Sequence, residues 1–130
     1  MFDTGHALHH DHTVVVLGAS PKPARYSNQA VRLLKEHGYR VVPVHPRFTD
    51  IEGLHAAPSL EAVEGPVDTL TLYVGPERSR PLIDDIVALR PGRVIFNPGT
   101  ESAELEARLQ SLEIPFIHGC TLVMLRTRQF

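Results

Sequence analysis

Short apolar stretches and amphipathic stretches alternate along the chain from residue 13 onward. The apolar stretches predict five strands, and the first and third of these are apolar enough to be buried on both faces. The strands are expected at residues 13–17, 40–44, 68–74, 93–96 and 115–118. Apolar residues at helical spacing predict helices at 28–36, 76–89 and 102–112.

Three further segments complete the predicted order of elements. Residues 54–57 are expected to form a short edge strand, followed by a helix start at Pro58 and Ser59. Residues 120–125 are expected to add a last helical turn or strand. Residues 121–125 are so apolar that we expect Leu122, Val123, Met124 and Leu125 to pack on the sheet, the alternative being an exposed surface for a partner.

Strands that alternate with helices through short connections indicate an α/β fold. The expected architecture is one doubly wound parallel sheet with helices on both faces. A chain of 130 residues is long enough for a single domain of this kind. We assign residues 13–130 to that domain and residues 1–12 to a flexible, histidine-rich tail.

Four loops follow predicted strands and are expected to meet at one crevice. Ligands of open parallel sheets bind beyond the carboxyl ends of the strands, where the strand order reverses. The loops that this rule selects are residues 18–20, 44–47, 74–78 and 97–100. The sequence therefore predicts a single binding crevice built from these four segments.

The first of these loops, Gly18, Ala19 and Ser20, has the residues of an anion-binding turn. Gly18 allows a sharp turn, and the amides before the following helix can bind phosphate. A dinucleotide-binding fingerprint would contain three glycines, and this loop has one. Taken alone, the loop fits an anion site and also fits a tight strand-to-helix turn.

The second loop argues against a nicotinamide dinucleotide. Proteins that bind NAD usually place Asp or Glu after the second strand to hold the ribose, and this chain has Val44, His45 and Pro46 there. The prolines form an extended wall suited to an adenine ring. Arg47 is either a phosphate contact or a solvated surface charge.

The third and fourth loops supply a few polar groups. Arg78 lies close to the predicted crevice, although most such arginines are surface charges. Asn97 and the exposed amide of Gly99 either bind an amide-rich ligand or belong to a helix cap made by Thr100 or Ser102.

Several segments together resemble a known family. They read GASPKPARYSNQAVRLLKEHGYRVVPVHPR, GLHAAPSLEAV, VDTLTLYVGPE and NPGTES. The chain thus resembles the small stand-alone CoA-binding proteins, which are similar to the CoA-binding domain of succinyl-CoA synthetase alpha subunits and of acyl-CoA synthetases. The family usually has Asn where His45 stands. The resemblance implies a Rossmann-like fold and coenzyme A as the ligand.

The resemblance also assigns roles to individual positions. Gly18, Ala19 and Ser20 would hold the CoA pyrophosphate, with Lys22 or Arg25 as counter-charges. The adenosine would lie along Val44, His45 and Pro46. The pantetheine would be flanked by Val74, Gly75 and Pro76, with Asn97, Pro98 and Gly99 further along the crevice.

No catalytic or metal-binding constellation is evident. Cys120 follows His118 closely, but the two side chains share a face only if the strand continues through Gly119. Cys120 is either a small buried apolar residue, which is the commoner case, or a nucleophile or a partner in a mixed disulfide with CoA. Histidines outside the tail show no metal-ligand spacing, and those inside it fit a polar tail better than a metal site.

Composition limits the partners and the compartment. The net charge is −2, which offers no basic field for nucleic acid, and no apolar run reaches bilayer length. A single cysteine fits the cytoplasm. We therefore expect a non-catalytic protein that binds CoA, acyl-CoA or a nucleotide, with any protein partner or homodimer left open. The alternative is a small enzyme, either an NAD(P)-dependent oxidoreductase or a transferase that uses Cys120.

Overall fold

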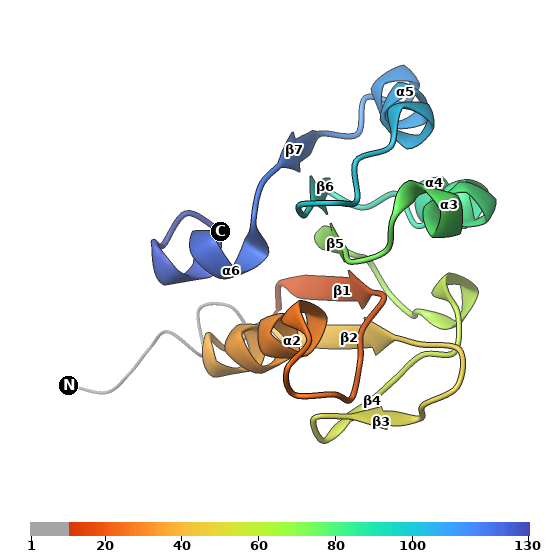
Figure 1. Ribbon diagram of the computed structural model, residues 1–130. Coiled ribbons are helices and arrows are strands. Elements are labelled where there is room, and N and C mark those ends of the chain that lie inside the picture. The colour runs from red at the N-terminus through yellow and green to blue at the C-terminus, as the bar shows by residue number, and fades with distance from the viewer. Residues whose placement is uncertain (1–10) are drawn as a thin grey trace.

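Five parallel strands form the central sheet, which has the order β2-β1-β5-β6-β7 (Figure 1). The computed structural model describes residues 11–130. The strands are β1 (Thr13–Leu17), β2 (Arg40–Val44), β5 (Thr69–Leu72), β6 (Arg93–Phe96) and β7 (Phe116–His118). All pairings in this sheet are parallel. The predicted strands are therefore confirmed, with β5 and β7 slightly shorter than expected.

Helices cover both faces of this sheet (Figure 1). On one face, Val14 and Val16 pack in a cluster with residues of α2 (Tyr26–Glu36) and α6 (Thr121–Arg126). On the other face, Val15 and Leu17 pack in a cluster with residues of α4 (Ile83–Ala88) and α5 (Ala103–Ser111). The prediction of a doubly wound, Rossmann-like α/β fold is confirmed.

The helix expected at 76–89 is interrupted. It consists of α3 (Pro76–Ser79), the 3₁₀ turn η2 (Arg80–Leu82) and α4. Pro81 lies inside the 3₁₀ turn and has no amide hydrogen to donate to the preceding turn. The prediction of one continuous helix was wrong for this local reason, which the sequence already contained.

The edge strand expected at 54–57 is also different. Residues Leu54–His55 form β4, which pairs antiparallel with β3 (Asp50–Ile51) in a separate two-stranded sheet. Glu52 and Gly53 both have positive φ, 52° and 76°, and turn the chain back on itself. Only Ala57 bridges to β2, at Val44. The helix start expected at Pro58 and Ser59 is the short 3₁₀ turn η1 (Leu60–Ala62).

The chain beyond β7 forms the helix α6, and it is only partly buried. Leu122 and Leu125 are 4% and 2% exposed and belong to the core. Val123 is 52% exposed and Met124 is half-buried. The expected packing is confirmed for the two leucines and wrong for Val123, because helical geometry turns neighbouring side chains to different sides.

The amino-terminal segment is described only from residue 11. Residues 1–10 of the predicted tail lie outside the described residues. His12 accepts a hydrogen bond at its backbone carbonyl from the amide of Arg40 at 3.1 Å, and its ring contacts that of Tyr39 with 5.1 Å between centroids. Across residues 11–130, the helices are too short or too polar to span a bilayer.

The burial of α6 generates a stability prediction. Leu125→Ala should lower the free energy of unfolding by about 2–5 kcal/mol, because it opens a cavity between α6 and the sheet. Val123→Ala, on the exposed side of the same helix, should change it by less than about 0.5 kcal/mol. Urea unfolding of both variants measures the difference. Equal losses would contradict the assignment of α6 to the core.

Candidate functional site

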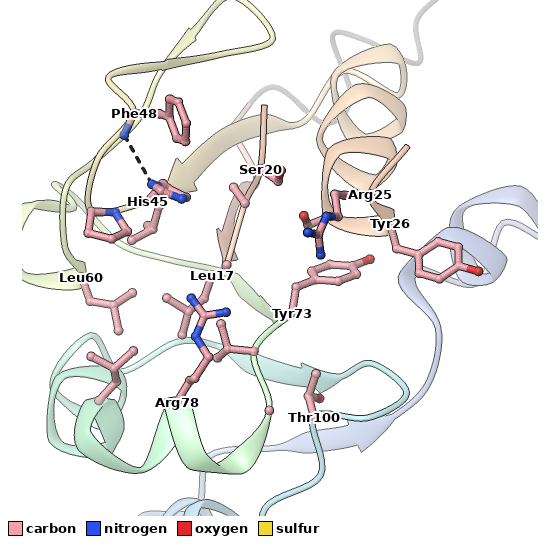
Figure 2. A pocket seen from close by; sticks show the side chains of 18 of the residues that line it. Leu17, Ser20, Arg25, Tyr26, His45, Phe48, Leu60, Tyr73, Arg78 and Thr100 are labelled. Carbon is pink, nitrogen blue, oxygen red and sulfur yellow. Dashed lines mark hydrogen bonds between the residues drawn. The ribbon is translucent and has the colours of Figure 1, made fainter. Parts of the chain in front are cut away.

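A cleft of about 890 Å³ lies at the carboxyl ends of β1, β2, β5 and β6 (Figure 2). The strand order reverses between β1 and β5, so the helices that follow these strands lie on opposite faces and leave a gap. Of the site residues predicted from the sequence, all but Pro76 and Asn97 line this cleft. The four predicted loops therefore do meet at one place.

Gly18 shapes the turn after β1. Its φ is +92°, a conformation that favours glycine. A Cβ at this position would lie 2.7 Å from Cγ1 of Val74 and 3.0 Å from the carbonyl oxygen of Tyr73. Gly18 is thus required for close packing of the first turn against the end of β5, and any larger residue would displace the turn.

Asn28 holds the same turn from within α2, and sequence reasoning missed it. Its side chain is fully buried, and its Nδ2 donates to the carbonyl of Ser20 at 2.9 Å and to Oε2 of Glu52 at 3.0 Å. Its Oδ1 accepts from Nε of Arg32 at 2.8 Å. The sequence does hold a signal for this role. Asn28 lies three positions before the buried Val31, so it is a polar residue on the apolar stripe of the helix.

The amino terminus of α2 opens into the cleft without a cap. Among the residues that the structure describes, no side chain caps its first-turn amides, and its first turn contains no acidic residue. The amino terminus of α5 differs, because Ser102 Oγ accepts from the amide of Leu105 at 3.2 Å and Glu104 is in the first turn. Tyr26 and Ser27 from the first turn of α2 line the cleft. The positive end of this helix dipole is therefore available to an anion.

The cleft carries an excess of positive charge. It is lined by Lys22, Arg25, Arg47 and Arg78, and by one acidic residue, Asp85. Within residues 11–130, none of the four cations is within ion-pair distance of a carboxylate. Figure 2 shows Arg25, from the α2 side, and Arg78, from α3, extending into the cleft. A chain with a net charge of −2 thus concentrates unpaired cations at one site.

One wall of the cleft is apolar and aromatic. Val44, Pro46 and Leu60 line it, and the ring of Phe48 lies 4.7 Å from that of His45 between centroids. Burial, together with the positive charges of Arg47 and Arg78, lowers the pKa of His45 below its usual value. This imidazole is therefore neutral at physiological pH, and the wall suits a flat, uncharged ring.

Tyr73 forms another part of the cleft that sequence reasoning did not single out. It follows β5 directly and lines the cleft, and Figure 2 shows its ring on the same side as Arg25. Burial raises the pKa of Tyr73 to about 12. The residue presents a neutral aromatic surface to the cleft.

Two predicted site residues, Pro76 beside the pantetheine and Asn97 further along the crevice, have other roles. Asn97 is 2% exposed, and its Nδ2 donates to Thr71 Oγ1 and to the carbonyl of Leu72, each at 2.7 Å. Its Oδ1 accepts from the amide of Thr121 at 2.9 Å, so it joins β5, β6 and α6. Pro76 is the first residue of α3 and does not reach the cleft.

Gly99 lies at the surface, but its amide already has a hydrogen-bond partner within the protein. It donates to the carboxylate of Glu101, at 3.1 Å to Oε1 and 3.3 Å to Oε2. Pro98 and Gly99 still line the cleft with the rest of their backbone, beside Gly75. The expectation that Asn97 and the Gly99 amide point toward a ligand is therefore corrected, because both groups have partners inside the protein.

Cys120 and His118 do not form a pair. The strand ends at His118, and Cys120 begins α6 as its N-cap. His118 stacks on Phe96 with 5.3 Å between ring centroids, and its Nε2 lies 3.2 Å from Glu106 Oε1. Neither residue lines the cleft. In the part of the chain that the structure describes, no three His, Cys, Asp or Glu residues are grouped as metal ligands.

Solved structures of similar proteins share this fold. A crystal structure of an uncharacterized protein has a TM-score of 0.85 and 40% identity, and the match covers 92% of this chain and 98% of that one. Cell-free ID.343 from Thermus thermophilus has a TM-score of 0.85 and 33% identity, covering 98% of this chain and 95% of that one.

Two other relatives are matched over less than half of their own length. A dinucleotide-forming acetyl-coenzyme A synthetase 1 from Candidatus Korarchaeum cryptofilum, solved with phosphate and ADP, has a TM-score of 0.71 at 24% identity. The match covers 90% of this chain but 27% of that enzyme, and shows the fold alone. The uncharacterized protein YneT of Bacillus subtilis (strain 168) is 30% identical over 60 residues, which is 46% of this chain and 44% of YneT.

A family match covers almost the entire domain. Residues 12–126 match the family described as CoA binding domain. The match includes every loop that lines the cleft and extends through α6. The parallel sheet and the cleft at its switch point agree with the match over that whole length. The chain belongs to the CoA binding domain family.

Proposed function

We propose that this protein binds coenzyme A, or an acyl-CoA, in the cleft at the carboxyl ends of β1, β2, β5 and β6. The observation that carries the proposal is the uncapped amino terminus of α2 beside the turn at Gly18, Ala19 and Ser20. Free amides and a helix dipole there suit the pyrophosphate. Family membership supports coenzyme A as the molecule that supplies it.

The rest of the ligand follows from the shape and charge of the cleft. Lys22 and Arg25 lie beside the first turn and can balance the pyrophosphate charge. The wall of Val44, His45 and Pro46 suits the adenosine, because its adenine ring is flat and uncharged. The pantetheine arm would then run along Val74, Gly75 and Pro98.

A binding role fits this cleft better than catalysis. Among the residues that line it, the titratable groups are cations, two tyrosines, the neutral His45 and Asp85, and Cys120 lies elsewhere. No side chain there is paired with another as nucleophile and base. We therefore propose a non-catalytic role, in which the protein senses or carries the bound coenzyme.

Coenzyme A should be preferred over NAD, because β2 is followed directly by His45 and Pro46 and not by a carboxylate that could hold a ribose diol. A ligand that binds only the native state at 100 times its Kd stabilises a protein by about 2.7 kcal/mol. Thermal unfolding should therefore shift upward with CoA and hardly move with NAD at equal concentration. A larger shift with NAD would reverse this preference.

The unpaired cations supply a test by mutation. Arg78→Gln should weaken CoA binding by about 1.5–3 kcal/mol, the contribution of a hydrogen bond to a charged group. Arg40→Gln is the matched control, because Arg40 is exposed at the amino end of β2, away from the cleft. Isothermal calorimetry of both variants measures the difference. Unchanged affinity in a folded Arg78→Gln protein would place the ligand elsewhere.

A further inference from the structure

The side chain of His45 is fixed by the loop that follows it. Its Nδ1 accepts hydrogen bonds from the backbone amides of Arg47 at 3.0 Å and of Phe48 at 3.3 Å (Figure 2). Its own backbone amide donates to the carbonyl of Ala57 at 3.0 Å. Both the backbone and the ring of His45 are thus held in place by bonds within the protein.

These bonds determine where the imidazole carries its proton. A nitrogen that accepts from two amides has no hydrogen, so in the neutral ring the hydrogen is on the other nitrogen, Nε2. Figure 2 shows the His45 ring between the backbone of Phe48 and the interior of the cleft, on the side of Ser20. The group that His45 presents to the cleft is therefore an N–H donor without a positive charge.

The same bonds shape the rim of the cleft. For the backbone of residues 46–48, the hydrogen bonds that the structure records are the two to Nδ1 of His45. This loop carries Arg47, one of the unpaired cations, and Phe48, whose ring lies against the imidazole. If the Nδ1 acceptor is removed, the backbone amides of Arg47 and Phe48 lose the hydrogen bonds that hold this part of the loop in place.

We propose that His45 is a positioning and specificity residue, which closes the loop 46–48 through Nδ1 and donates Nε2–H to an oxygen in the ribose–phosphate part of a bound nucleotide. The ligand contact rests on the proposed function, because the nearby cations and the first turn favour a phosphorylated ligand. The loop closure does not depend on that function, since it is formed by the protein alone.

Protonation should open this loop. A proton on Nδ1 would face two N–H donors, and the added charge would lie near Arg47 and Arg78. The other charged groups around the cleft are Lys22, Arg25 and Asp85. Because the folded protein binds this proton less tightly than the unfolded chain, stability from His45 is complete above pH 6.5, the ordinary pKa value, and falls as the pH drops below it.

The first test uses the ligand-free protein and nitrogen-15 NMR. We expect the neutral His45 ring to carry its hydrogen on Nε2 and to titrate with a midpoint below pH 6.5. The amide signals of Arg47 and Phe48 should shift with the same midpoint. A proton on Nδ1 at neutral pH, or a midpoint at or above 6.5, would overturn the loop closure. This result does not depend on which ligand binds.

The second test compares variants of His45 by calorimetry with CoA at neutral pH. His45→Ala removes both nitrogens and should weaken binding about tenfold or more. His45→Asn keeps an acceptor for the Arg47 amide, as in an Asx turn, and should lose only about threefold. His55→Ala, on the exposed strand β4, is the control and should bind as the wild type does.

The outcomes separate the two proposals. Equal losses in the Ala and Asn variants would show that the Nδ1 acceptor is not needed, and wild-type affinity in the Ala variant would exclude any role in binding. Failure of the wild-type protein to bind CoA would instead refute the proposed function, and with it the ligand contact. The loop closure would then be decided by the NMR titration alone.

Discussion

Strand β1 lies inside the sheet with its side chains packed alternately against the two helical layers. Val14, Val15 and Val16 are all completely buried, so the strand cannot shift or reverse without exposing apolar surface. Its neighbours are β2 on one side and β5 on the other, and the strand order reverses at this point. The position of the cleft, the turn at Gly18 and the direction of α2 all follow from this placement.

The positive charges that line the cleft favour an anionic ligand. The chain is slightly acidic overall, yet one cleft is lined by four cations that form no ion pair with any described carboxylate, beside the amino terminus of α2, which no described side chain caps. Unpaired like charges in proximity disfavour the empty cleft and are relieved by an anionic ligand. The uncharged His45 adds a donor to this group without adding to the repulsion.

Two buried asparagines, one in α2 and one at the end of β6, show why the roles of polar residues are hard to interpret from sequence. Asn97 was expected to reach a ligand, but the hydrogen bonds of its side chain go to Thr71, Leu72 and Thr121 inside the protein. Asn28 was not singled out, yet it fixes the carbonyl of Ser20 at the edge of the cleft. Asn28 holds backbone that lines the cleft, whereas Asn97 joins β5 and β6 to α6 beneath it. Neither role can be recognised without knowing the partner residues.

From its local patterns alone, the amino-acid sequence specified the strands of the central sheet, helices on both faces and half of the residues that line the cleft. Apolar periodicity and a glycine after β1 are local features, and burial of the resulting strands leaves few arrangements. It took the folded structure to show that the Asn97 side chain points inward, that His45 accepts from two amides and that Arg78 forms no ion pair within residues 11–130. These facts depend on side-chain direction and on residues that fold close to one another, which no local pattern records.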